Sequence, residues 1–450
     1  MTSRRVPASL LGALVLGTSA VLAACGSSHD GAGVPADASA DAAQAEDASS
    51  VGDARDTDTT APQDNGAPSS VYPAPHPAPP VLTNPKGGPV LAAPRVMFLY
   101  YPGYPYEAAL DAFGQALGAS SYWSAATAEY GVGALTWVSS KVLTGPAPTK
   151  ISDTEIETFF HDQLIAGAFG VPDPSVIYTL FYPASTTISS GGSQSCSSFG
   201  GYHSNIAAQA GGMVKTFAYA VLPTCTGFGG LQGVEEVSGA LTHELVEAVT
   251  DPFPTTSNGA DTAYGNVDDD HFVWTLGGGG ESGDLCVREP DAFYKDMTLG
   301  LTVQRTWSNA QAAAGHDPCA PSLGTPFFAS APELPDVGTV KLPMGGGRGT
   351  ITSKSVRIPV GQSRVVTIDL YSDQATSGPW NVSVRDALAD LGDNKTLGFA
   401  WDRTSGVNGE KLHLTVSVHA ASAVFPGAHA FTVYSTLGAS VQAWTALVTE

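Results

Sequence analysis

One segment of the chain combines a histidine with carboxylates at helical spacing. A helix turns by about 100° per residue, which gathers four side chains of residues 239–252 in roughly one quadrant: His243, Glu244, Glu247 and Asp251. The opposite side is apolar and carries Leu241, Leu245, Val246 and Val249. Side chains four residues apart converge on one point, so His243 and Glu247 have the spacing of two metal ligands. Glu244 lies beside them, where a carboxylate can take a proton from a metal-activated water.

This segment resembles the active-site helix of zincin metallopeptidases, whose His-Glu-x-x-His signature supplies two zinc ligands and a general base. The resemblance implies that His243 is a zinc ligand and that Glu244 acts as general base or acid. Glu247 stands where the second histidine of the signature would be. A carboxylate in that position can still bind zinc, and it also suits a harder ion such as manganese or calcium.

A cation held by His243 and Glu247 needs a third ligand, for which the sequence offers several candidates. Our first choice is Asp284, in the segment Glu281-Ser282-Gly283-Asp284-Leu285-Cys286. The glycines at 277–280 let the backbone fold tightly over a site, and a disulfide at Cys286 would fix it there. His203 is the second candidate because a disulfide at Cys196 would pin its loop, although a lone histidine is more often structural.

Two acidic segments and one structural interpretation stay open as alternatives. Asp261-Thr262-Ala263-Tyr264-Gly265 is similar to the Asp-x-x-Tyr-Gly element that aspzincins place after their helix. The run 266–270, Asn-Val-Asp-Asp-Asp, suits calcium, although it lacks the loop glycine and terminal glutamate of an EF-hand. The structural interpretation is an amphipathic helix with a solvated acidic face, in which His243 is merely hydrogen-bonded.

The N-terminus carries the pattern of an export signal. Arg4 and Arg5 precede an apolar run, residues 10–22, which is followed by Leu22-Ala23-Ala24-Cys25-Gly26. The block around Cys25 resembles the lipobox of bacterial lipoproteins. The resemblance implies a signal peptide over 1–24, acylation of Cys25 and a membrane partner through that lipid. Gly26 stands where an aspartate typically retains such proteins in the inner membrane, so we expect the outer membrane.

Four cysteines remain after Cys25: Cys196, Cys225, Cys286 and Cys319. An even number in a chain bound for an oxidising compartment predicts two disulfides. Three pairings are possible. Nearness in sequence is the reason to expect Cys196 with Cys225 and Cys286 with Cys319.

Residues 25–91 have the composition of a disordered, acidic and proline-rich tether. Acidic residues far outnumber Arg55 and Lys86, and Ala, Ser and Pro separate them, so this stretch cannot bury a core of its own. The whole chain has a formal charge of -22 with only 14% charged residues. Binding to nucleic acid by phosphate neutralisation is therefore disfavoured.

The elements that must position the site lie in residues 92–322, where we predict a zincin-like α+β domain. Buried strands are expected at 96–101, 176–182 and 217–222. Helical spacing joins Leu110, Phe113 and Leu117, and a capping box of Ser152 and Glu155 opens a further helix. Strands that alternate with helices are typical of a mixed or α/β sheet.

Residues 330–450 change to a period of two, which is typical of half-buried antiparallel strands. Val366, Ile368 and Leu370 alternate with polar residues, and the same pattern recurs at 412–418. Glycine-rich turns separate these runs. We expect an all-β sandwich of about seven strands.

Together these features favour a surface-anchored, metal-dependent hydrolase that acts on protein or peptide substrates with zinc as the cofactor. The main alternative is a non-catalytic binding or adhesion lipoprotein that recognises glycan or protein. A metal-dependent hydrolase of cell-wall or polysaccharide material is a third possibility. The sequence contains no serine nucleophile elbow, phosphate-binding glycine loop or dinucleotide fingerprint.

Overall fold

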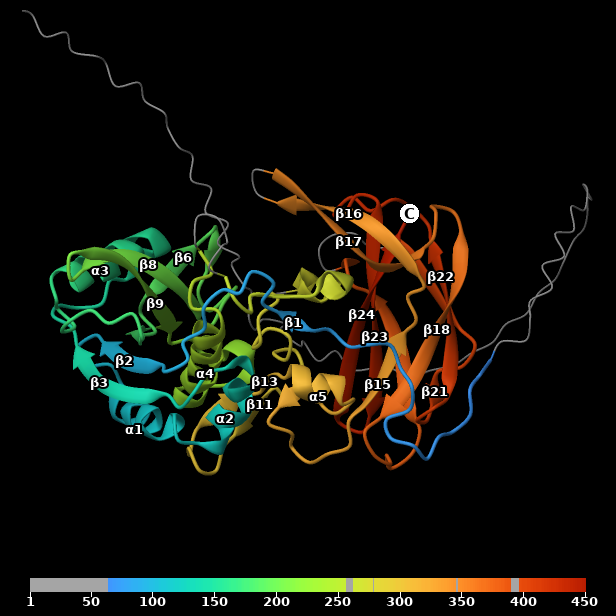
Figure 1. Cartoon of the computed structure of the whole chain (residues 1–450), viewed down its shortest axis with the longest axis horizontal. Coiled ribbons are helices and arrows are strands. Elements are labelled where there is room, and N and C mark those ends of the chain that lie inside the picture. Colours follow the sequence, from blue (N-terminus) through green and yellow to red (C-terminus); the bar gives the residue numbers. More distant parts are fainter. Residues whose placement is uncertain (1–63, 256–261, 278, 345–346, 390–395) are drawn as a thin grey trace, which may run out of the picture.

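The chain folds into two adjoining bodies, seen in a computed structural model that describes residues 64–255, 262–277, 279–344, 347–389 and 396–450. Figure 1 shows the N-terminal body, which holds the longer helices, beside a C-terminal body made of strands. The chain is thus mixed α/β and rich in strands, with several separate sheets. The predicted signal peptide and Cys25 lie outside the described residues.

A five-stranded sheet forms the centre of the N-terminal body. Its order is β3-β2-β5-β9-β8, and all neighbours are parallel except β8 and β9. The strands are β2 (Arg95–Tyr100), β3 (Thr136–Val142), β5 (Val176–Tyr182), β8 (Tyr202–Ala210) and β9 (Met213–Pro223). The apolar runs at 96–101, 176–182 and 217–222 therefore form adjacent central strands, as predicted.

Helices cover both faces of this sheet. The first face packs against α1 (Glu107–Leu117), α2 (Ser121–Thr127) and α4 (Val234–Thr250), and the second packs against α3 (Asp153–Ile165). The predicted capping box is present, because the Ser152 side chain accepts from the Glu155 backbone and the Glu155 side chain accepts from the Ser152 backbone. Burial on both faces explains why the central strands are continuously apolar.

Short elements carry the chain from α4 across to the second body. They are β10 (Asn266–Val267), the 3-10 helix η3 (Asp269–Gly277), β11 (Phe293–Lys295), β12 (Thr302–Gln304), β13 (Thr306–Trp307), α5 (Asn309–Ala313) and β14 (Cys319–Ala320). Strand β12 packs along α4. Trp274 of η3 contacts the rings of Trp307 and Trp444, so its indole joins the two bodies.

The C-terminal body is a β-sandwich with more strands than the sequence suggested. One sheet has the order β15-β18-β22-β20 and the other β16-β17-β24-β23-β19-β21. The strands are β15 (Phe328–Pro332), β16 (Asp336–Met344), β17 (Gly347–Arg357), β18 (Ser363–Ser372), β19 (Trp380–Asp386), β20 (Leu397–Trp401), β21 (Ser405–Gly406), β22 (Lys411–Val418), β23 (Ala428–Leu437) and β24 (Ser440–Thr449). A shared apolar core lies between the two sheets.

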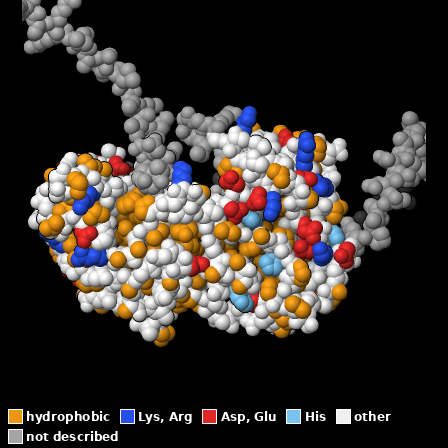
Figure 2. Space-filling model, in the orientation of Figure 1, with side chains coloured by type: hydrophobic (Ala, Val, Ile, Leu, Met, Phe, Trp, Pro, Cys, Tyr) orange, Lys and Arg blue, Asp and Glu red, His pale blue; other side chains and the backbone are white. Residues whose placement is uncertain are grey.

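The face of the molecule in Figure 2 carries charged side chains of both signs in small mixed groups over the C-terminal body. Oppositely charged side chains pair at the surface of the structure, for example Lys354 with Asp270 and Lys411 with Glu333. Exposed pairs of this kind contribute little to stability. The net negative charge of the chain therefore does not form one continuous acidic patch on this face.

The last part of the predicted tether is packed against the protein. Residues 64–91 run along both bodies: β1 (Leu82–Thr83) pairs with β10, and Ala74 and Leu82 are buried. The backbone of this stretch is extended, as its prolines require. The prediction of a free spacer up to residue 91 is wrong for this part, because its backbone groups and small side chains find partners on the folded body.

The structure contains two disulfides, Cys196–Cys225 and Cys286–Cys319, which confirms the predicted pairing. Disulfides are typical of proteins in oxidising compartments, which points to a location outside the cytoplasm. Among the described residues, no helix has both the length and the apolar composition needed to cross a membrane.

Candidate metal centre

Three of the predicted site residues, His243, Glu244 and Glu247, line one cavity of about 460 Å³ between α4, β8 and the loop after η3. Asp284 does not line this cavity, but its Oδ1 atom lies 3.8 Å from Nε2 of His243. His243, Glu244 and Glu247 reach it from α4, His203 from β8, and Glu281 from the loop. The apolar side of α4, with Leu241, Leu245, Val246 and Val249, is fully buried in the core against the sheet. The two sides of the helix therefore separate packing from chemistry, as the sequence pattern predicts.

His243, Glu247 and Asp284 form a compact set of potential ligands. Their donor atoms all lie within 4.8 Å of one another. The Nε2 atom of His243 is 3.1 Å from Oε2 of Glu247 and 3.8 Å from Oδ1 of Asp284. Two donors that each lie about 2.1 Å from a shared cation are separated by roughly 3 to 4 Å, depending on the angle between them at the ion, so these distances fit one bound ion.

Gln304 of β12 fixes the orientation of the His243 ring. The side-chain amide of Gln304 donates to the carbonyl of Gly283 (2.8 Å), which leaves its oxygen 3.0 Å from Nδ1 of His243. An amide oxygen only accepts, so Nδ1 of His243 carries the proton. The Nε2 lone pair of the neutral ring then faces Glu247 and Asp284, which is the usual arrangement of a metal-binding histidine.

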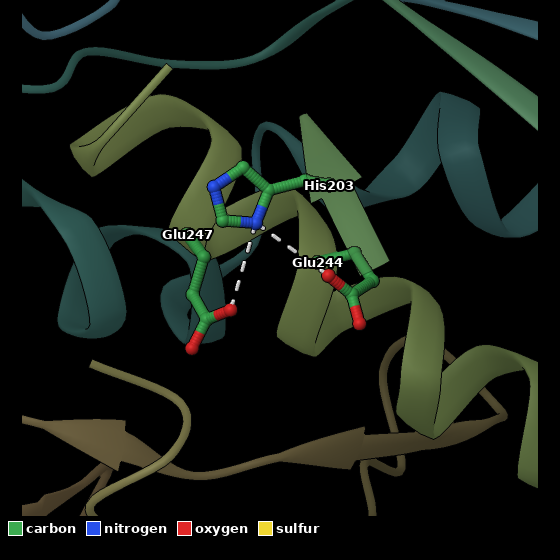
Figure 3. A group of neighbouring side chains, drawn as sticks. All are labelled: His203, Glu244 and Glu247. Atoms are coloured by element: carbon green, nitrogen blue, oxygen red, sulfur yellow. Dashed lines mark ion pairs between the residues drawn. The ribbon is translucent and has the colours of Figure 1, made fainter. Parts of the chain in front are cut away.

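His203 has a similar arrangement on the other side of Glu247. Its Nε2 atom lies 3.1 Å from the backbone carbonyl of Asp251, which can only accept a hydrogen bond. The Nδ1 atom lies 3.6 Å from Oε2 of Glu244 and 3.7 Å from Oε2 of Glu247. Figure 3 shows this nitrogen directed between the two carboxylates. A second group of potential ligands thus consists of His203, Glu244 and Glu247.

Three buried carboxylate oxygens at the centre lack a hydrogen bond. They are Oε2 of Glu247, Oε1 of Glu281 and Oδ1 of Asp284, and none has a hydrogen-bonding partner within the part of the chain that the structure describes. In two of these carboxylates the second oxygen is satisfied: Oε1 of Glu247 accepts from the backbone of Gly283, and Oδ2 of Asp284 from that of Glu281. Unpaired buried carboxylates are costly, so this donor set fits a bound divalent cation.

The pKa values of these groups reflect the crowding of carboxylates around two imidazoles. Burial by itself lowers the pKa of His243, but the carboxylates of Glu247 and Glu244 raise it well above its usual value. Burial raises the pKa of Glu281 and Asp284 well above the ordinary range, and the charge on Glu247 raises both further. Without a cation the centre therefore takes up protons, which a bound cation displaces.

Glycines let the backbone approach the site closely. A Cβ atom on Gly283 would lie 2.6 Å from Nδ1 of His243, and one on Gly201 would lie 2.8 Å from Oε1 of Glu244. Any side chain at these two positions would displace a site residue. A disulfide lies close to each of these glycines in the sequence. Cys196–Cys225 crosslinks the loop that contains Gly201, and Cys286 of the second disulfide follows Gly283 by three residues.

The structure brings together His243, Glu244, Glu247 and Asp284, and it adds His203, which the sequence offered as an alternative third ligand. Asp261 lies outside the described residues. In the proposed calcium segment, Asp268 is engaged by His271 at 2.8 Å and by the backbone of Val81, and Asp270 pairs with Lys354. These partners explain the acidic turn without a cation. The roles of the four site residues in binding and catalysis stay predictions.

Two residues of the centre were missed by the sequence analysis. Gln304 lies on a short strand far from α4 in the sequence, and an isolated glutamine carries no recognisable signal. Glu281 belongs to the segment chosen for Asp284, but only the fold shows that its carboxylate also faces His203, at 3.5 Å.

Comparisons with known proteins do not identify a family. No family model matches the chain, and no curated protein matches it significantly. Among solved structures, the chain is similar to S-layer protein SbsC domains 4 and 5, with 17% identity over 29% of this chain and 78% of that one, at a TM-score of 0.16. Surface layer protein SbsC domains 1-6 match at 14% identity and the same TM-score, over 33% of this chain and 22% of that one. At such TM-scores the likeness carries no argument about fold or function.

Proposed function

We propose that the chain is a metal-dependent hydrolase, most directly a peptidase. The observation that carries this proposal is the position of Glu244. Its carboxylate lines the same cavity as His243 and Glu247, which form a group of potential ligands with Asp284, and its Oε1 atom lies 4.0 Å from Nε2 of His243. A proton acceptor beside a set of cation ligands is the arrangement that hydrolysis of a carbonyl substrate requires.

The protein residues divide the work between binding and proton transfer. His243, Glu247 and Asp284 would hold the cation, while Gln304 keeps His243 in the correct tautomer. A bound divalent cation supplies Lewis-acid chemistry, which lowers the pKa of water and polarises a substrate carbonyl. Glu244 accepts the proton of the attacking water and returns it to the leaving amine. Burial raises the pKa of Glu244, which suits this exchange.

The ligand set also bears on the identity of the cation. One nitrogen and two oxygen donors suit zinc, which accepts histidine and carboxylate ligands. The excess of oxygen donors over nitrogen also suits manganese. We propose zinc as the physiological cation, following the resemblance of the α4 segment to zincins.

The same proposal includes the location of the enzyme. Acylation at Cys25 would attach the chain to the outer membrane, and the residues between Cys25 and the packed segment would hold the site away from the lipid surface. The two disulfides support a compartment outside the cytoplasm. Mass spectrometry of the membrane fraction tests the acylation directly, and its absence from Cys25 would contradict this part.

Glu244→Gln tests the enzymatic proposal. We expect this variant to keep the cation held by His243, Glu247 and Asp284, measured by elemental analysis, and to lose about 10²- to 10⁴-fold in the rate of casein or peptide hydrolysis. The matched control is Glu235→Gln on the first turn of the same helix, where Glu235 pairs with Lys295 outside the cavity. The control should hydrolyse at the rate of the parent chain.

Other outcomes would favour other functions. A cation that binds without any chelator-sensitive peptide hydrolysis would favour a binding or adhesion protein with a structural ion. Hydrolysis of cell-wall or polysaccharide material in place of peptide, lost in Glu244→Gln, would keep the mechanism and change the substrate class.

A further inference from the structure

His203 has no place in the single-cation arrangement proposed above. The His243 group contains Glu247 and Asp284, whereas the group of potential ligands around His203 contains Glu244 and Glu247. The two groups share only Glu247. Each imidazole presents one nitrogen to its own pair of carboxylates, and each has its other nitrogen against an oxygen that can only accept.

The distances around His203 favour a cation over a proton. A hydrogen on Nδ1 would have to reach oxygens at 3.6 and 3.7 Å, which is too long for a hydrogen bond. Donors separated by such distances can share an ion that lies about 2.1 Å from each. Without an ion or a proton, the Nδ1 lone pair would face two carboxylates, which is repulsive.

The charge of the centre also exceeds what one cation balances. The carboxylates that line the cavity or contact the two imidazoles are Asp153, Glu244, Glu247, Asp251, Glu281 and Asp284, and Asp153 accepts a hydrogen bond from the Tyr202 hydroxyl. The residues that line the cavity include no lysine or arginine. One divalent cation would leave a large negative charge in a buried site, whereas two would neutralise most of it. The unpaired Oε1 of Glu281 lies 3.5 Å from Nε2 of His203, which is the nitrogen that faces the Asp251 carbonyl, so Glu281 adds negative charge without being assigned as a ligand.

We propose that the centre binds a pair of divalent cations that share the Oε2 atom of Glu247. The first is held by His243, Glu247 and Asp284, and the second by His203, Glu244 and Glu247. Only Oε2 of Glu247 can bridge, because Oε1 accepts from the backbone of Gly283 and Asp284. The proposal rests on the proposed function only for the first cation. Glu244 would bind the second cation through Oε2, and its Oε1 atom would stay on the side of His243.

A manganese titration of the purified full chain tests the pair. We expect two Mn²⁺ per chain by calorimetry and elemental analysis, with an electron paramagnetic resonance signal that shows magnetic coupling between the ions. His203→Ala and His203→Gln should each bind one Mn²⁺ with an uncoupled signal. His243→Ala should also keep one, and Glu247→Gln should lose the coupling. Thermal unfolding of the metal-free variants checks that each is folded.

The matched control is His413→Ala, which removes an equally buried histidine that contacts Asp402 in the C-terminal body. It should bind two coupled ions. One Mn²⁺ in the parent chain that is lost from both the His203 and His243 variants would overturn the proposal in favour of a single shared ion. Absence of any ion would overturn it together with the proposed function. Two coupled ions without hydrolysis would support the pair and contradict only the enzymatic proposal.

Discussion

At the scale of single residues, the centre is defined by what its histidines contact on the side away from the carboxylates. Gln304 holds Nδ1 of His243, and the carbonyl of Asp251 holds Nε2 of His203. Each contact selects one tautomer and directs the remaining lone pair at acidic oxygens. The alternative of a merely hydrogen-bonded His243 on a solvated face does not fit, because His243, Glu244 and Glu247 are all buried.

Gln304→Ala should weaken cation binding without unfolding the protein. The change frees Nδ1 of His243 and lets the ring rotate or adopt the wrong tautomer, so we expect a 10- to 100-fold loss of zinc affinity. Competition with a chromophoric chelator measures this loss. Gln209→Ala, an exposed glutamine on β8, is the control and should leave the affinity unchanged. Unchanged affinity in Gln304→Ala would mean that the amide has only a packing role.

The sequence was sufficient for the residues of one helix and insufficient for their partners. His243, Glu244 and Glu247 were found because the helical period fixes their relative directions. Asp284 was found through its glycines and Cys286, which are local signals. The sequence offered His203 only as the second candidate because its position beside α4 depends on the order of the strands, and period-two or apolar patterns do not encode that order.

At the scale of elements, α4 buries three acidic side chains along its length, Glu236, Glu244 and Glu247. Glu236, on its first turn, lies beside Leu231, Ala240 and Phe293. Burial raises the pKa of Glu236 to about 7, and a hydrogen bond from the backbone of Cys225 only partly offsets this effect. The protonated form is therefore favoured in the folded state relative to the unfolded chain.

Glu236→Gln should stabilise the protein at high pH and have little effect at low pH. A carboxyl whose pKa is higher in the folded state costs stability as the pH rises from about 4.5 through 7. The variant removes this cost, which we estimate as roughly 2 kcal/mol at pH 8. Thermal unfolding at pH 4.5 and pH 8 measures the difference.

The neighbouring Glu235 offers a control of opposite sign. Burial by itself raises its pKa, but Lys295 and Thr302 lower it below the usual value. Glu235→Gln should therefore lose stability at pH 8, where the parent carboxylate is charged and paired. If Glu236→Gln and Glu235→Gln were both more stable than the parent chain at pH 8, the effect would come from the net charge of the helix and not from the burial of Glu236.

The disulfide Cys286–Cys319 should affect both stability and the site. Its sequence separation is 33 residues, so the loss of the crosslink in a Cys286→Ala, Cys319→Ala variant should cost about 3 to 4 kcal/mol. Because Asp284 lies two residues from Cys286, we also expect weaker binding of the cation that Asp284 holds. Calorimetry measures both. The control is the Cys196→Ala, Cys225→Ala variant, in which the two cysteines are separated by 29 residues. It should lose a similar amount of stability, but its affinity for the cation that Asp284 holds should fall by less.

The sequence predicted many of the long helices and strands, but it did not predict which strands lie side by side in the sheets. The apolar runs became β2, β5 and β9, and Ser152 with Glu155 opened α3. Strand β3 was missed because its residues are mostly half-exposed and lack an apolar run. Among the sandwich strands that were not singled out, β15, β20 and β21 are short and β17 contains two glycines, so their pattern is weak, whereas β16 and β24 are long strands that the analysis of the period missed.

At the scale of the whole molecule, one extended segment connects the two bodies. It is visible in Figure 1 as the blue stretch that crosses from the C-terminal body to β1. Near its start, His76 stacks on Tyr371 of the sandwich, with ring centres 3.7 Å apart. Near its end, the backbone of Leu91 donates to the carbonyl of Val249 at the end of α4. The composition of residues 64–91 does not reveal this packing, because the partners are supplied by distant parts of the chain.

Asn408 anchors this segment to the sandwich and allows its role to be tested. Its side chain donates to the carbonyls of Ser69 and Val71 and accepts from the backbone of Ala74. Asn408→Ala leaves the buried backbone amide of Ala74 and the partly exposed carbonyls of Ser69 and Val71 without this partner, so we expect a loss of roughly 1 to 3 kcal/mol and detachment of the segment. Elastase should then cleave after Val71 faster, as mass spectrometry would detect. Asn381→Ala, an exposed asparagine on β19, should cleave like the parent chain. If both variants resist equally, the contacts around His76 and Leu82 hold the segment without Asn408.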